Sequence, residues 1–394
     1  MSRNKPRGLA LTAVFAVPLA AAVLILSACT PPLPPDVLAA QAEANITCQT
    51  GSVDVGAPEI FVGAVDAVGQ SLTTTCPDQV IVEVAADQSA PVQLVDVLPS
   101  AALLASFKAT SCLTGTTLVV PAFTYPVTMA FNEPGLEGIQ LSPKAIAGIL
   151  SGTVKTWDDP LIAASNEGLL LDGLPPLQLV TSKSDQGSVQ AMTAWLTATT
   201  PDTWKQGTVG TLSVGESFDT VADLIASIIS NEGQIAVLPV TTANNNVLGM
   251  ASLPAGPNTD IWVTADDVQL AKVGSAAMTN QTSTLAGGES KDMLIYGPGL
   301  GGVPVEGQFD IAASKIVLSE GQEQIGWPVM GVAHLLVCND KSDPLPLSFA
   351  QYLVRLAGQG SLEAFGVTPL PEPIRIKTFA PLQVTTAANA GSNE

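Results

Sequence analysis

Residues 131–160 read FNEPGLEGIQLSPKAIAGILSGTVKTWDDP, and this stretch decides more about the fold than any other part of the chain. Its centre predicts a helix with clear ends. Ser142 can cap the first turn, Pro143 fits the first helical position, and Gly152 can close the helix in a left-handed conformation. The Trp157-Asp158 pair that follows is typical of a structural turn.

Outward from this helix, short apolar runs alternate with amphipathic stretches on both sides. Strands are predicted at residues 80–84, 117–123, 127–132, 177–182, 234–240 and 331–339. Helices are predicted at residues 60–70, 141–152, 188–198, 221–230, 263–278 and 348–366, and the Gly-rich residues 284–308 are expected to form a loop. This alternation predicts an α/β chain with mostly parallel sheets.

Four sequence blocks, taken in order, resemble the substrate-binding proteins of phosphate ABC transporters, the PstS-like family. The opening stretch carries the family's Asn, Pro-Gly-Leu, Leu-Ser-Pro and Trp-Asp-Asp-Pro elements. The other blocks are LQLVTSKSDQGSVQAMTAWL (177–196), SNEGQIAVLP (230–239), and IGWPVMGVAHLLV (325–337) with the helix that follows it. The resemblance covers residues 115–380 well and residues 48–110 weakly.

This resemblance implies a type II periplasmic-binding-protein-like fold of the α/β class. Such a fold has two lobes with mixed sheets flanked by helices, and crossing strands join the lobes. The first lobe is expected to take residues 47–128 and 325–383, the second residues 129–324, and residues 384–394 should form a flexible tail. The ligand lies in the cleft, and lobe closure around it shifts an open–closed equilibrium.

The resemblance also implies an anion site in the loop at residues 183–188. The family holds phosphate with backbone N–H groups at helix starts, with hydroxyls, and with an Arg and an Asp. A helix start suits an anion because its first amides lack partners and the dipole is positive there. Lys183 stands where the family has Arg, so a bidentate fork becomes a point charge. The candidate ligand-binding residues of this loop are Lys183, Ser184, Asp185, Gly187 and Ser188.

The first lobe departs further from the family pattern. The opening phosphate loop falls near residues 47–55, where Thr50 and Ser52 are the candidate contacts. Residues 87–90 replace the family's glycine turn, and the acidic residue that accepts the phosphate proton aligns with Ala101. A buried anion without these partners would be poorly compensated.

Each candidate of the loop also has a purely structural explanation. Lys183 and Asp185 can form a solvated pair in an exposed loop. Ser184 and Ser188 can cap the helix that begins there, although capping and ligand contact do not exclude each other.

Three residues near the predicted lobe crossing leave similar alternatives. Thr124 and Tyr125 either face the cleft or only pack. His334 lies in an apolar run, which is typical of a core or cleft-wall histidine, and it is the only histidine in the chain. Because no cysteine pair has CxxC spacing either, we expect neither a metal site nor a cofactor.

The N-terminus has the pattern of an export signal. Arg3, Lys5 and Arg7 precede an apolar run from Leu9 to Leu26, which ends in Ser27-Ala28-Cys29. This pattern predicts a lipoprotein signal peptide over residues 1–28, acylation of Cys29, and a Pro/Ala-rich tether over residues 29–46. The alternative is a plain transmembrane anchor, since the apolar run is long enough to span a bilayer.

Four cysteines remain once Cys29 is assigned to the lipid. An even number in an exported protein favours disulfides over metal ligation or free thiols. We favour the pairs Cys48–Cys76 and Cys112–Cys338, because the first two flank one strand–helix unit and the other two lie beside predicted strands. Four buried free thiols remain the alternative.

Charge and composition exclude several classes of partner. The formal net charge is −20, which argues against nucleic-acid binding and against electrostatic attachment to anionic lipid. The hydrophobic share of 46% supplies a large core, so the chain is not disordered. The sequence has no GxSxG elbow with a nearby His, no HExxH motif and no P-loop, and we do not expect an enzyme.

Together these features predict a lipid-anchored solute-binding protein on the outer face of the cell membrane. It would capture a small oxyanion, phosphate first, and deliver it to the permease subunits of an ABC transporter. The alternative is a degenerate surface lipoprotein that keeps the fold as a scaffold and no longer transports phosphate.

Overall fold

The computed structural model describes residues 35–97, 99–254, 262–264, 278–284, 290–296, 308–310, 315–317, 323–325, 327–370, 375–376 and 378–384. The predicted signal peptide, Cys29 and most of the predicted tail lie outside the described residues, as do residues 265–277 of the predicted helix at 263–278. Among the described residues, no helix is long and apolar enough to cross a membrane.

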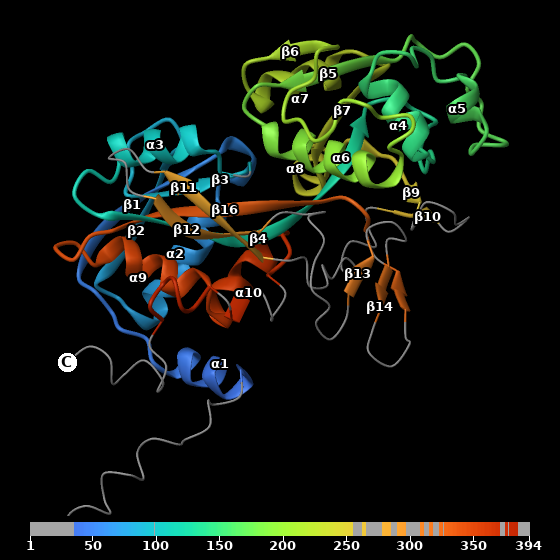
Figure 1. Ribbon diagram of the computed structural model, residues 1–394. Coiled ribbons are helices and arrows are strands. Elements are labelled where there is room, and N and C mark those ends of the chain that lie inside the picture. The colour runs from blue at the N-terminus through green and yellow to red at the C-terminus, as the bar shows by residue number, and fades with distance from the viewer. Residues whose placement is uncertain are drawn as a thin grey trace, which may run out of the picture.

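Two lobes are visible in the ribbon, and one continuous run of strands links them (Figure 1). The strand order is β2-β1-β3-β16-β4-β7-β5-β6, with β8 paired to β4. In the first lobe, β1 pairs in parallel with β2 and β3, while β16 is antiparallel to both β3 and β4. The strands of this lobe are β1 (Gly51–Ala57), β2 (Gln79–Ala85), β3 (Val92–Val95), β4 (Thr116–Phe131) and β16 (Met330–Asn339).

Helices cover both faces of the first-lobe sheet. In Figure 1, α3 lies on one side of the sheet, and α2, α9 and α10 lie on the other. The α3 side has its own small core, in which Leu104 and Phe107 pack against Val119 and Leu336. The helical segments of this lobe are η1 (Glu59–Phe61), α2 (Ala64–Thr75), α3 (Ala101–Thr110), α9 (Leu345–Leu353) and α10 (Leu356–Phe365).

The second lobe is built around the far end of β4. There β4 pairs antiparallel with β7 and β8, and β5 pairs in parallel with β7 and β6. Its strands are β5 (Gln178–Ser182), β6 (Glu216–Phe218), β7 (Gln234–Pro239) and β8 (Gly249–Met250). Its helices are α4 (Pro143–Leu150), α5 (Pro160–Ala163), α6 (Gln186–Thr199), α7 (Val221–Ser230) and α8 (Val240–Asn245).

Small antiparallel sheets complete the described elements. They are β9 (Leu253–Pro254) with β10 (Trp262–Val263), β11 (Met278–Thr284) with β12 (Ser290–Tyr296), and β13 (Gln308–Asp310) with β14 (Lys315–Val317) and β15 (Glu323–Ile325). The stretch at 284–308 was expected to be a loop, but β12 lies within it, and β11 and β13 overlap its two ends at Thr284 and Gln308.

Strand β4 is the element that joins the lobes. The sequence predicted two strands here, but a single strand of 16 residues runs through both lobes. Its two prolines lie where the pairing changes. Pro121 lies beside the irregularity between Ala333 and His334, and Pro126 is the last residue paired to β16 before β4 pairs with β7. A proline lacks the N–H that a regular ladder needs, so it fits such interruptions.

The helix centred in residues 131–160 forms as predicted. Ser142 Oγ accepts the backbone N–H of Ala145 at 3.2 Å, and Pro143 is the first helical residue. Gly152 follows the helix with φ of +72°, a left-handed conformation that favours glycine.

The predicted helix at 348–366 is wrong in one respect, because it is two helices. Helix α9 ends at Leu353, and α10 begins after Arg355, whose backbone is extended. The break frees the carbonyl of Leu353, which accepts a 2.9 Å hydrogen bond from the buried side-chain amide of Gln359. The same amide also donates to Ala122 O, so the break ties α10 to strand β4.

Part of the predicted tether is folded. Residues Pro35–Ala44 form helix α1, and Glu43 pairs with the buried guanidinium of Arg375 at 2.6 Å. Arg355 also donates to the carbonyl of Asn45 at 2.7 Å. The tether prediction over 29–46 is therefore wrong for α1, which is held against the first lobe by the ion pair of Glu43 with Arg375, while Arg355 holds the carbonyl that follows the helix.

Both disulfides lie in the first lobe. One joins Cys48 to Cys76 with a Cα–Cα distance of 5.3 Å, and the other joins Cys112 to Cys338 at 5.1 Å. These are the two pairs that the sequence favours. The second disulfide ties the segment after α3 to β16, across a separation of 226 residues.

Candidate functional site

The start of helix α6 faces the first lobe and carries the loop singled out by the sequence. Strand β5 ends at Ser182, and Asp185 caps the helix by accepting the backbone N–H of Ser188 at 3.0 Å. The N-cap is thus Asp185, whereas the structural alternative assigned capping to Ser184 or Ser188. Asp185 is only 2% exposed and Ser188 is fully buried. This loop therefore forms a buried, polar contact between the lobes.

A first-lobe carboxylate lies directly on this helix start. Asp96, just after β3, accepts the backbone N–H of Gly187 through Oδ2 at 2.8 Å. The hydroxyl of the buried Tyr125 donates to the carbonyl of Asp96 at 3.3 Å. A side chain on Gly187 would not fit, because a Cβ there would lie 2.1 Å from that carbonyl and 2.5 Å from the Tyr125 hydroxyl. The lobes therefore meet here in backbone contact.

A second first-lobe carboxylate lies on the start of α7. Glu59, the first residue of η1, accepts the N–H of Val221 at 2.8 Å and that of Ala222 at 2.7 Å. It also accepts the hydroxyl of Ser184 at 3.0 Å. The third amide of α7 is satisfied within its own lobe by the N-cap Thr220. The positive ends of two second-lobe helices thus both hold carboxylates from the first lobe.

Burial changes the acidity of the carboxyl groups in this site. Burial, assisted by the charge of Asp96, raises the pKa of Asp185 from 3.8 to about 7. Burial also raises the pKa of Asp96, although its hydrogen bond from Gly187 opposes that shift. Groups with a perturbed pKa in a cleft between lobes mark this contact as a candidate functional site.

The structure brings together four of the seven predicted ligand residues. Ser184, Asp185, Gly187 and Ser188 lie at the lobe contact, but Lys183 points away and pairs with the exposed Asp219 at 2.6 Å. That pair replaces the predicted Lys183–Asp185 pair.

Thr50 and Ser52 are not part of this site. Both are exposed and lie at the amino end of β1, where Gly51 hydrogen-bonds to Asp78. In sheets of parallel strands, ligands bind outside the carboxyl ends of the strands. At the carboxyl end of β1 the chain places Glu59, and not Thr50 or Ser52.

Two carboxylates of the lobe contact escaped prediction from the sequence. The family's acidic residue was aligned with Ala101, whereas the carboxylate found at the contact is Asp96, five positions earlier, because the short strand β3 gives too little pattern to fix the alignment. Glu59 follows the buried residues 55–58 at the end of β1, and a carboxylate directly after a buried strand end is the signal that could have revealed it.

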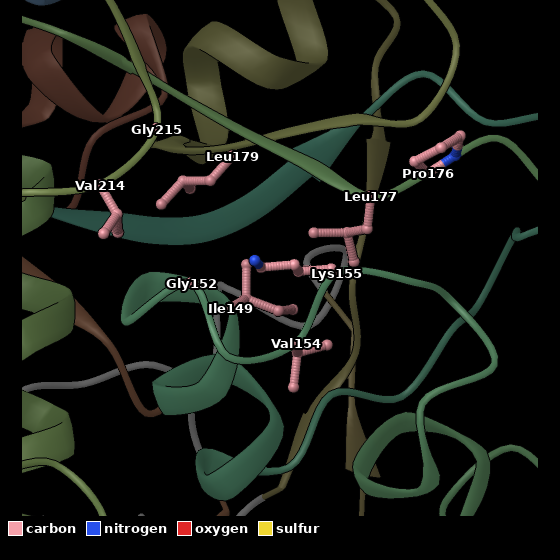
Figure 2. Close-up of a pocket in the computed structure, with 9 residues that line it drawn as sticks. All are labelled: Ile149, Gly152, Val154, Lys155, Pro176, Leu177, Leu179, Val214 and Gly215. Carbon is pink, nitrogen blue, oxygen red and sulfur yellow. The ribbon is translucent and has the colours of Figure 1, made fainter.

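The described residues line a pocket between the lobes and another within the second lobe. One, of about 420 Å³, lies between η1 of the first lobe and helices α7 and α8 of the second, and Glu59 is part of its wall. The other, of about 460 Å³, belongs to the second lobe alone. Figure 2 shows its mostly apolar wall with the ammonium group of Lys155 inside it. Its lining residues are Ile149, Gly152, Val154, Lys155, Pro176, Leu177, Leu179, Val214 and Gly215.

Comparison with known proteins places this architecture in a family. A family model described as a PBP superfamily domain matches residues 81–355. The chain belongs to the PBP superfamily. Members of this family are of the substrate-binding type, and the two-lobed fold expected from the PstS-like resemblance is confirmed.

Two curated mycobacterial proteins are similar to this chain. "Phosphate-binding protein PstS 3" of Mycobacterium leprae is 23% identical over 278 residues, which are 69% of this chain and 66% of that protein. "Phosphate-binding protein PstS 2" of Mycobacterium tuberculosis is 22% identical over 270 residues, which are 66% of this chain and 65% of that protein. The chain spans just under two thirds of both relatives.

Solved structures share this PBP superfamily fold. A periplasmic phosphate-binding protein, PfluDING, bound with phosphate has a TM-score of 0.56 at 14% identity, covering 84% of this chain and 93% of its own. A human phosphate-binding apolipoprotein has a TM-score of 0.54 at 16% identity, covering 84% and 94%. A phosphate-binding protein from Stenotrophomonas maltophilia has a TM-score of 0.51 at 14% identity, covering 84% and 93%.

The donor set of the site does not suggest a metal ion. Within the part of the chain that the structure describes, no three His, Cys, Asp or Glu side chains gather closely enough to hold one. The carboxylates at the lobe contact are instead directed at backbone N–H groups and a serine hydroxyl.

Proposed function

We propose that this chain is an extracytoplasmic solute-binding protein of the phosphate-binding type. It captures a small oxyanion, phosphate, between its lobes and delivers it to the permease of an ABC transporter. One observation carries the proposal: the Gly187 amide at the start of α6 faces the other lobe at a buried contact and already donates to a carboxyl group, that of Asp96. A helix start that binds one oxyanion group can bind another.

The same residues give each part of a phosphate ion a partner. When the lobes separate, the Gly187 amide and the Ser184 and Ser188 hydroxyls are free to donate to phosphate oxygens. Asp96 can accept the proton of a hydrogen phosphate. Closure then removes water, which strengthens each of these hydrogen bonds.

The proposal includes an anchor on the outer face of the cell membrane. It rests on the small-small-Cys sequence at residues 27–29, which directly follows the apolar run. Acyl chains on Cys29 would keep the binding lobes beside the permease, since two acyl chains bind a membrane far more stably than one.

A second candidate function is a surface scaffold that binds no phosphate. The observation that favours it is the charge of the site. Glu59 and Asp96 occupy the helix starts, and Lys183, the cation of the loop, faces Asp219. Phosphate would have to displace carboxylates without gaining a cation.

Calorimetric titration of residues 30–394 with phosphate, and with sulfate as a comparison anion, separates the two functions. We expect phosphate to bind, and Ser188→Ala to weaken binding about tenfold through the loss of one hydrogen bond to a charged group. Ser230→Ala, on the exposed end of α7, is the matched control and should bind like the unmodified chain. No heat with either anion, and no thermal shift, would favour the scaffold.

A further inference from the structure

Glu59 is the most heavily engaged side chain across the lobe contact. Three donors of the second lobe converge on its two carboxylate oxygens. The N–H of Val221 and the hydroxyl of Ser184 reach Oε2 at 2.8 and 3.0 Å, and the N–H of Ala222 reaches Oε1 at 2.7 Å. Hydrogen bonds to an ionised acceptor are the strong ones, so this single residue contributes much of the polar attraction between the lobes.

The chain uses the same device a second time, within one lobe. Glu83 of β2 accepts the N–H of Gly63 at 2.8 Å and that of Val65 at 3.0 Å, at the start of α2. Both partners of that contact belong to the first lobe. Both carboxylates therefore accept backbone N–H groups at a helix start. Of the two, only Glu59 makes this contact between two lobes that can move apart.

Glu59 is also placed where it can leave. It is partly exposed, and it lines the 420 Å³ pocket between η1 and helices α7 and α8. A rotation of its side chain into that pocket would free the α7 amides and the Ser184 hydroxyl without unfolding either lobe. An incoming anion would then meet unoccupied donors.

We propose that Glu59 is a tethered anion that latches the two lobes together when no solute is present, and that a captured oxyanion must displace it. The latch itself needs only the contacts above, while the competition rests on the proposed phosphate-binding function. A protein whose binding-competent state is only fractionally populated binds with an affinity reduced by that fraction. If nine chains in ten are latched, releasing the latch should tighten phosphate binding about tenfold.

Small-angle X-ray scattering of ligand-free residues 30–394 tests the latch directly. We expect Glu59→Ala to have a larger radius of gyration than the unmodified chain, and Glu59→Gln, which keeps the shape but not the charge, to lie between them. Acetate at high concentration should compact Glu59→Ala, because it supplies the missing carboxylate. Glu83→Gln is the matched control and should lose stability without any change in scattering.

Unchanged scattering of Glu59→Ala and Glu59→Gln would overturn the latch, whatever the phosphate result. Phosphate titration of the same variants tests the competition. Tighter binding by Glu59→Ala supports it, and equal binding by the variant and the unmodified chain refutes it. If the variant opens but no protein binds phosphate, the latch stands and the proposed function fails.

Discussion

Asp185 is a buried carboxyl group that makes the folded state less stable at neutral pH. Its pKa is raised from 3.8 to about 7, so between those values the folded chain keeps a proton that the unfolded chain has lost. Stability therefore falls as pH rises from about 4 to about 7, and the loss is complete above pH 7. At 1.36 kcal/mol per pKa unit, the full effect of Asp185 on the free energy of unfolding is about 4 kcal/mol. The raised pKa of Asp96 adds a further change of the same sign.

Asp185→Asn should remove this loss while keeping the helix cap, because Asn is as good an N-cap as Asp. We expect its free energy of unfolding to exceed that of the unmodified chain by up to about 4 kcal/mol at pH 8, and to equal it near pH 4. Denaturant unfolding across this pH range measures the difference. Parallel pH profiles for the two proteins would contradict the assignment.

Gly187 is the residue at which the lobes meet most closely. A Cβ at this position would lie 2.1 Å from the carbonyl oxygen of Asp96, and backbone on both sides cannot yield without separating the lobes. Gly187→Ala should therefore stay folded but scatter as a more extended molecule, and lose affinity for phosphate.

The matched control for this substitution is Gly360→Ala in α10, where a Cβ would meet no atom within 4 Å. It should leave scattering unchanged and stabilise the chain by about 0.5 to 1 kcal/mol, as alanine does in a helix. If scattering shows that the Gly187→Ala variant is as compact as this control, the lobes do not close on Gly187.

At the scale of elements, α1 is held against the first lobe by an ion pair with a buried arginine. The Arg375 side chain is 1% exposed and donates to Glu43 at 2.6 Å and to the carbonyl of Val354 at 2.9 Å. Glu43→Gln replaces a charged partner of this buried cation by a neutral one, so we expect the free energy of unfolding to fall by about 3 kcal/mol.

Chemical denaturation measures that loss, and the exposed Glu363→Gln is the control, which should change stability by less than about 0.5 kcal/mol. Faster proteolysis within residues 35–44 of Glu43→Gln should accompany the loss. An unchanged unfolding midpoint would mean that Arg375 does not depend on α1.

Elements with strong local signals could be predicted from the sequence, and residue positions set by long-range pairing could not. Helices 143–150 and 221–230 have caps and apolar periodicity within their own residues, which predict them closely. Glu59 contacts Ser184, which lies 125 residues away, and no local pattern records such a meeting. The second-lobe residues of the lobe contact were therefore named from the sequence, whereas the first-lobe candidates Thr50 and Ser52 lie away from that contact.

The whole molecule combines a two-lobed binding body with a predicted lipid anchor, and the anchor is open to a direct test. Cys29→Ala should move the protein from the membrane fraction to the soluble fraction. The variant lacks the thiol that is acylated, so it loses the apolar contact of the acyl chains with the membrane. Membrane fractionation of cells expressing each form measures this. Cys112→Ser, which removes a first-lobe disulfide, is the control and should leave the distribution unchanged.

The sheet order also dictates when this molecule can be completed during its synthesis. Strand β16 lies between β3 and β4 in the sheet, although β4 ends at Phe131 and β16 begins only at Met330. A nascent chain that ends before residue 330 has all the strands of the second lobe, but an open gap in the first-lobe sheet. Until β16 arrives, β3 and β4 expose unpaired edges that can aggregate. The first-lobe sheet can therefore be completed only after β16 has been synthesised, whereas the described strands of the second lobe are all present earlier.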